Sequence, residues 1–269
     1  PPQKMALASS LIVTIGMVGG VLAQTPITLL IANYTWRGAL MGVAFFGVLI
    51  TFVIWSFVKI KETKTEGNKP ALKISVWQSL KTVMKQPQNW VCGLFIMLLN
   101  LPVAILGALF GVKYLTFAYH LSPIEGSSIV SMLFFGMIFG SPFFGWFSDF
   151  LKRKKLPMLM GAALCLFFML AVMYLNNLSS VSLHVLFFAI GFTSACQVLG
   201  YPMITESNSP AVTGSALSLA AILIMGGGYG LGLPFVGYLL DLNWGSQALA
   251  YQNAFLCIPI GIGLGLIAL

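Results

Sequence analysis

Charged residues are scarce in this sequence. Aspartate, glutamate, lysine and arginine together make up 7% of the 269 residues, whereas about 25% is usual in soluble domains. A water-soluble surface cannot be built from so few charges, so the composition excludes a soluble globular protein. The chain is instead 58% hydrophobic, and apolar runs of about 20 residues, long enough to cross a bilayer, recur from one end to the other. We therefore predict an all-α integral membrane protein, a polytopic helical bundle.

Residues that bind metals or act as nucleophiles are also few. The chain has two histidines, both near span ends, and four cysteines within or near apolar segments: His120, His184, Cys92, Cys165, Cys196 and Cys257. Their spacing matches no metal site and no disulfide framework, so we expect neither metal nor cofactor. The acidic residues outside the linker described below (Glu125, Asp149, Glu206 and Asp241) lie at span ends and form no carboxylate pair. These observations disfavour a membrane-embedded enzyme.

Hydropathy predicts eight transmembrane helices. The predicted spans are Met5 to Ala32, Gly38 to Phe57, Trp90 to Tyr119, Ser127 to Phe147, Leu156 to Tyr174, Leu183 to Met203, Gly214 to Leu240 and Tyr251 to Leu269. The first is too long for a signal peptide and lacks a cleavage site.

Basic residues are distributed very unevenly between the two sides of the predicted bundle. Twelve of the fourteen, including Lys4, seven linker lysines and residues 152–155, fall on one side, while Arg37 and Lys113 fall on the other. The positive-inside rule then predicts that both termini, the linker and the Asp149 loop are cytoplasmic. The net charge of +8 follows from this topology, and no basic face points to a nucleic acid.

Residues 59–88 form the longest hydrophilic stretch, and we interpret them as a cytoplasmic linker. Within it, Ser75 and Gln78 match a capping box. The apolar residues that follow, Val76, Leu80, Val83 and Met84, recur at helical spacing opposite Lys81 and Lys85. This pattern predicts an amphipathic helix at the membrane surface; the alternative is a solvated helix without contacts.

One loop carries the most specific motif in the chain. Gly145, Asp149 and the basic run from Lys152 to Lys155 follow the order G-x-x-x-D-x-x-x-R/K-R/K. This resembles the loop signature of the major facilitator superfamily, except that Leu151 and Lys152 stand where a glycine is usual. The resemblance implies that Gly145, Asp149, Lys152 and Arg153 act as a conformational latch on the cytoplasmic side; the alternative is a topological anchor.

The resemblance extends over essentially the whole chain and implies a domain organisation. Carriers of that superfamily have two six-helix halves joined by a long linker. By analogy, residues 1–58 would be the last two helices of the first half, residues 59–88 the linker, and residues 89–269 the complete second half. The chain would then be a carrier truncated at its N-terminus, with four helices missing.

Polar residues inside spans are costly and therefore mark candidate sites. Asn100 lies about 15 Å deep, near the predicted midplane, and Pro102 after it cannot donate a backbone hydrogen bond. We expect a broken helix lining a substrate cavity here. Ser194, Gln197 and Tyr201 share one helical face and could meet Asn100 across the cavity; the alternative is bonding between neighbouring helices.

Two further residues are weaker candidates for substrate contact. Gln24 lies near the outer end of the first span. Lys113 is the only basic residue well inside a span, and its side chain either snorkels to the interface or faces the cavity, where it would attract an anionic or zwitterionic substrate.

Glycines and prolines suggest positions where helices bend. Gly226, Gly227 and Gly228 crowd the seventh span ahead of Pro234, and together with Pro102 we interpret them as hinges. Gly136 and Gly140 form a G-x-x-x-G pattern in the fourth span. Close packing without any hinge is the alternative for all of these glycines.

The sequence therefore predicts a secondary transporter in a bacterial inner membrane. It would move a small polar metabolite, such as an amino acid or organic anion, by alternating access, with a proton or cation as a coupling ion. Its partners would be this small-molecule substrate and the lipid bilayer. A membrane enzyme, a channel or a non-transporting sensor remains the alternative.

Overall fold

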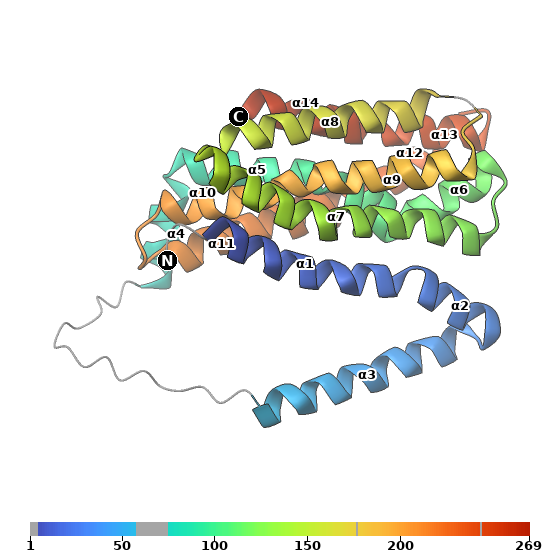
Figure 1. The fold of residues 1–269 in the computed structure, drawn as a ribbon, viewed down its shortest axis with the longest axis horizontal. Helices are drawn as coiled ribbons and strands as arrows, with labels where there is room; N and C mark the ends of the chain where they lie inside the picture. The colour runs from blue at the N-terminus through green and yellow to red at the C-terminus, as the bar shows by residue number, and fades with distance from the viewer. Residues whose placement is uncertain (1–4, 58–74, 176, 243) are drawn as a thin grey trace.

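The computed structural model describes residues 5–57, 75–175, 177–242 and 244–269, and the described chain is helical without a strand. Eight of its helical segments are long and apolar enough to cross a membrane, which confirms the predicted fold class. Residues 59–74 of the predicted linker lie outside the described part of the chain. Adjacent spans run antiparallel, so α1 begins and the last helix ends at the same end of the bundle (Figure 1).

Five of the eight spans are regular or nearly so. α1 (Met5–Ala23) and α2 (Thr25–Asn33) together make the first span, and α3 (Trp36–Phe57) makes the second. α7 (Pro123–Leu151) and α8 (Lys155–Tyr174) are single helices, and α13 (Gln247–Phe255) continues into α14 (Cys257–Ala268).

The other three spans each change helix type near their middle. One runs from α5 (Pro87–Pro102) through the π-helix η2 (Val103–Phe110) into α6 (Gly111–Tyr119). Another runs from α9 (Ser180–Ser194) through the 3-10 helix η3 (Ala195–Leu199) into α10 (Gly200–Glu206). The third runs from α11 (Thr213–Ile222) through the π-helix η4 (Leu223–Gly232) into α12 (Leu233–Asp241). Such changes are frequent at functional sites.

Glycines bring α7 and α9 into very close contact. A side chain added at Gly136 would meet the backbone carbonyl of Phe188, and one added at Gly191 would meet the carbonyl of Leu133. Gly140 faces the backbone of α9 in the same way. Small residues therefore let the two helix backbones approach each other, and the packing interpretation holds for the Gly136–Gly140 pattern. On the other side of α7 lies α1 (Figure 1).

α3 is apolar but almost entirely exposed. Ala39 is the one residue of this helix that is buried in the structure, and the helix stands apart from the bundle in Figure 1. An apolar helix exposed all round is typical of a helix surrounded by lipid or by further helices.

The predicted amphipathic helix exists as α4 (Val76–Met84), but it docks on protein. Its Val83 is fully buried against α5 and α11. Asn89, at the start of α5, donates to the carbonyl oxygen of Val83 at 3.0 Å, and its side-chain amide exchanges two hydrogen bonds with that of Asn208. The predicted capping box is wrong, because the Ser75 side chain makes no capping hydrogen bond.

Candidate functional site

The structure brings Asn100 and Gln197 together, although they lie 97 residues apart. Asn100 Nδ2 donates to Gln197 Oε1 at 3.1 Å. Asn100 stands in the last turn of α5, three residues before the first residue of η2, and Gln197 lies within η3, so both residues lie where the helix type changes. Gln197 is only 3% exposed. The two residues therefore meet, and they do so through a direct bond between neighbouring helices, the alternative to contact across a cavity.

This amide pair leaves one acceptor and one donor without a partner. Asn100 Oδ1 and Gln197 Nε2 are buried and make no hydrogen bond in the described structure. The result does not depend on how the amides are oriented, because flipping both would free Asn100 Nδ2 and Gln197 Oε1 instead. A buried unpaired polar atom costs about 1 to 3 kcal/mol. The pair can therefore offer one hydrogen bond of each kind to a bound molecule.

The other residues predicted on this face contribute differently. Ser194 is fully buried, and its hydroxyl donates to the carbonyl oxygen of Gly191, one turn earlier on the same helix, at 3.0 Å. It is therefore already paired within its own helix. Tyr201 is half-buried on α10, where it packs against the apolar core. Only Gln197 of this predicted face bonds Asn100 in the structure.

The two weaker candidates lie away from the amide pair. Gln24 Nε2 donates to the backbone carbonyl oxygen of Gly107 in η2 at 2.7 Å, which ties the junction between α1 and α2 to the π-helix. Lys113 is exposed on α6.

The predicted break at Pro102 is wrong, because the helix continues. Pro102 lacks an N–H group, and Val103 after it bonds the carbonyl oxygen of Asn100, three residues back. From Val103 the chain continues as a π-helix, so the span is helical on both sides of the proline.

The glycine run predicted to be a hinge coincides with the second π-helix. Gly226 has no atom within 4 Å of where a side chain would begin, whereas Gly227 faces the Met97 side chain on α5. Pro234 lies near the start of α12, directly after η4 in the same continuous span. Close packing therefore explains why a glycine stands at position 227, but it does not explain the glycine at position 226.

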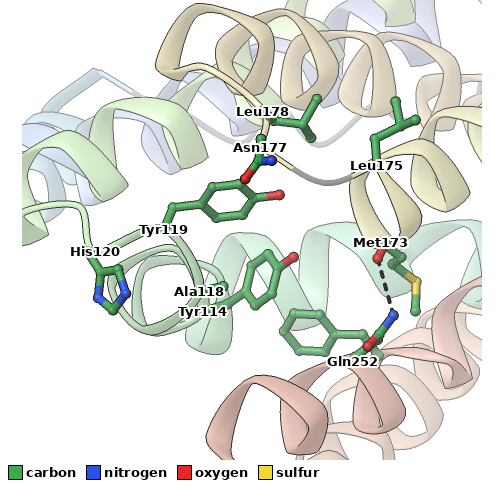
Figure 2. Close-up of a pocket in the computed structure, with 10 residues that line it drawn as sticks. Tyr114, Ala118, Tyr119, His120, Met173, Leu175, Asn177, Leu178 and Gln252 are labelled. Atoms are coloured by element: carbon green, nitrogen blue, oxygen red, sulfur yellow. Dashed lines mark hydrogen bonds between the residues drawn. The ribbon is translucent and has the colours of Figure 1, made fainter.

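Sequence reasoning missed a pocket at the end of the bundle opposite Asp149. It has a volume of about 740 Å³ and lies between α6, α13 and the connection from α8 to α9. Figure 2 shows the hydroxyls of Tyr114 and Tyr119 directed into this space, and Gln252 donating to the Met173 carbonyl oxygen at 3.4 Å. The signal available in the sequence was a group of aromatic residues near two span ends, with Tyr114 and Tyr119 on one span and Tyr251 and Phe255 on the other.

No three His, Cys, Asp or Glu side chains within the described ranges lie close enough together to hold a metal ion. The same residues show four free cysteines, three of them buried.

Comparison with known proteins identifies the family. The sequence profile of the Major Facilitator Superfamily matches residues 96–269, well over half of the chain. The chain belongs to the Major Facilitator Superfamily. It is accordingly a membrane transport protein. The matched region begins within α5 and runs to the last residue. A search among curated proteins gives no match.

The facilitator-type loop between α7 and α8 lines a recess of about 800 Å³. The recess is bounded by Ser148, Asp149, Lys152, Lys154, Lys155, Met203 and Glu206. Its ion pair joins Lys154 to Glu206 at the end of α10, whereas no ion pair involving Asp149 forms between the described residues. Lys152 and Arg153 are both exposed. Sequence reasoning missed this ion pair, because Glu206 lies more than fifty residues after the motif.

Lys152 is one of the two residues that stand where the superfamily loop pattern has a glycine. It ends α7 with φ 51° and ψ 26°, in the left-handed region, where glycine is favoured because it has no Cβ. The left-handed turn at the end of α7 is therefore made by a lysine.

Proposed function

We propose that this Major Facilitator Superfamily chain carries a small polar metabolite across a membrane by alternating access. The observation that supports this most directly is the buried Asn100–Gln197 pair with its unpaired acceptor and donor. Natural proteins seldom keep buried polar atoms unpaired unless they serve a function. In this proposal the solute makes the two missing hydrogen bonds when it is bound.

The irregular segments next to the pair support a moving site. η2 follows Asn100 and η3 contains Gln197, and η4 with its five glycines packs against α5. Stretches of 3-10 helix within a helix often mark hinges, and π-helical turns are frequent at functional sites, so we infer that these segments let the spans bend around the solute. Pro102 and Gly226 to Gly228 would then act as hinges.

The distribution of basic residues supports an orientation. Twelve of fourteen lysines and arginines belong to the Asp149 side of the chain, so we propose that this side faces the cytoplasm, in a bacterial inner membrane. The Asp149 loop would close that side in one state of the cycle. No acidic residue is predicted near the middle of a span, so in this proposal any coupling proton or cation binds outside those positions.

Solute binding and uptake test the proposal. A thermal-shift screen of the purified carrier against amino acids, organic acids, sugars and nucleosides would identify a solute, and uptake would follow in proteoliposomes. We expect Asn100→Ala and Gln197→Ala each to weaken binding about fivefold, since each removes a hydrogen bond of about 1 kcal/mol. Amounts in the membrane should stay nearly unchanged.

Ser194→Ala is the matched control. Its hydroxyl already bonds its own helix, so its loss should leave the affinity for the solute unchanged. If both amide variants bound and transported the solute like wild type while their expression fell, the amide pair would be a packing feature and not a binding site.

A further inference from the structure

One side of the linker helix α4 is held firmly on the bundle. Ser79 is 5% exposed and Val83 is 0% exposed, and the two residues lie one turn apart on the same side of the helix. Asn89 donates to the carbonyl oxygen of Val83, and Trp90 Nε1 donates to that of Met84 at 2.9 Å. These bonds fix the rotation of α4 about its axis, so the direction of its other side is determined.

The opposite side of α4 carries two large apolar residues and two lysines. Trp77, Lys81, Met84 and Lys85 follow one another at i, i+4, i+7 and i+8 and therefore share that side. Trp77 is 65% exposed and Met84 48% exposed, and both lysines are exposed. Neither lysine belongs to an ion pair with any residue that the structure describes.

This side of α4 lies where a membrane surface would be. α4 precedes α5, the beginning of a predicted span, by two residues, and it lies at the same end of the bundle as the start of α11 and the end of α10 (Figure 1). Tryptophan is enriched at the level of the lipid headgroups. Lysines near the surface of a leaflet are attracted to anionic lipids.

We propose that the Trp77–Lys85 side of α4 binds the headgroups of anionic phospholipids. The indole of Trp77 and the thioether of Met84 would enter the boundary between headgroups and acyl chains, and the two ammonium groups would pair with lipid phosphates. A helix that only contacted water would have no reason to carry an exposed tryptophan beside an exposed methionine. The proposal is independent of which solute the carrier moves.

Quenching of Trp77 fluorescence by brominated lipids tests the proposal. The whole chain is placed in nanodiscs of phosphatidylcholine that contain a rising fraction of brominated phosphatidylglycerol or of brominated phosphatidylcholine. Because the chain has six tryptophans, the Trp77 signal is the difference between wild type and Trp77→Phe. We expect phosphatidylglycerol to quench this signal at a lower mole fraction than phosphatidylcholine.

The two lysines should account for this preference. Each of Lys81→Gln and Lys85→Gln should raise the phosphatidylglycerol fraction for half-maximal quenching about fivefold, which corresponds to about 1 kcal/mol per lysine near an anionic surface. Lys113→Gln removes the same charge from an exposed position on α6 and should leave the fraction unchanged. In wild type, 1 M salt should abolish the preference, because it shortens the screening length to about 3 Å.

Two results would overturn the proposal. If neither lipid quenched Trp77, this side of α4 would face water or be covered by protein. If both lipids quenched it equally at low salt, α4 would touch the membrane without selecting anionic headgroups.

Discussion

Replacing both members of the buried amide pair should make the protein more stable and weaken solute binding about 25-fold, the product of two fivefold effects. In wild type, Asn100 Oδ1 and Gln197 Nε2 have no partner, and each such atom costs about 1 to 3 kcal/mol. The bond between the side chains contributes about 0.6 kcal/mol, the average for such bonds in a membrane protein. Asn100→Leu combined with Gln197→Met removes both costs and the bond, so we expect a net gain of about 1 to 5 kcal/mol.

The single variants should behave in the opposite way. Gln197→Met leaves both polar atoms of Asn100 unpaired, and Asn100→Leu leaves both polar atoms of Gln197 unpaired. Either variant therefore keeps two unpaired atoms and loses the bond, which should lower the unfolding free energy by about 0.6 kcal/mol. The two effects are strongly non-additive, as expected for residues in direct contact.

Unfolding titrations in detergent micelles on wild type, both single variants and the double variant would measure these free energies. Solute binding to the same four proteins would be measured in parallel. A double variant that was less stable than either single variant, with binding intact, would refute the argument, because the pair would then hold the helices together.

Three further substitutions test other parts of the structure. Gly191→Ala should destabilise the protein by about 1 to 3 kcal/mol, because its Cβ would meet a backbone carbonyl of α7, whereas Gly237→Ala, with nothing within 4 Å, should be neutral or stabilising in the same unfolding titration. Lys152→Gly should raise the unfolding free energy by about 1 kcal/mol by relieving the left-handed backbone, and Arg153→Gly, whose φ is not positive, should not. Glu206→Gln should lower it by less than about 1 kcal/mol, because the broken ion pair is partly exposed; a loss above about 2 kcal/mol would show that this ion pair behaves as a buried one.

The places where the sequence-based predictions were wrong are local. The capping box at Ser75 was wrong because the Ser75 side chain makes no capping hydrogen bond, and the side-chain bond from Asn89 holds the other end of α4. The break at Pro102 was wrong because the span stays helical on both sides of the proline, with α5 before it and η2 directly after it.

The candidate site was predictable in its residues but not in its details. Depth in the bilayer selected Asn100, and helical spacing selected Ser194, Gln197 and Tyr201. Spacing could not show that Ser194 turns its hydroxyl to its own helix while Gln197 alone bonds Asn100. Those choices depend on side-chain geometry where α9 ends at Ser194 and the tighter 3-10 turn of η3 begins.

The sequence by itself determined the eight spans, the all-helical class and the family, because span length, hydropathy and the Gly145–Asp149 motif are local properties of the chain. Only the tertiary structure decided which polar residues meet. Asn100 and Gln197 are 97 residues apart, and their contact depends on how two spans are rotated against each other. That rotation is set by the packing of many apolar side chains and of glycines such as Gly191, whose combined effect no short sequence pattern records.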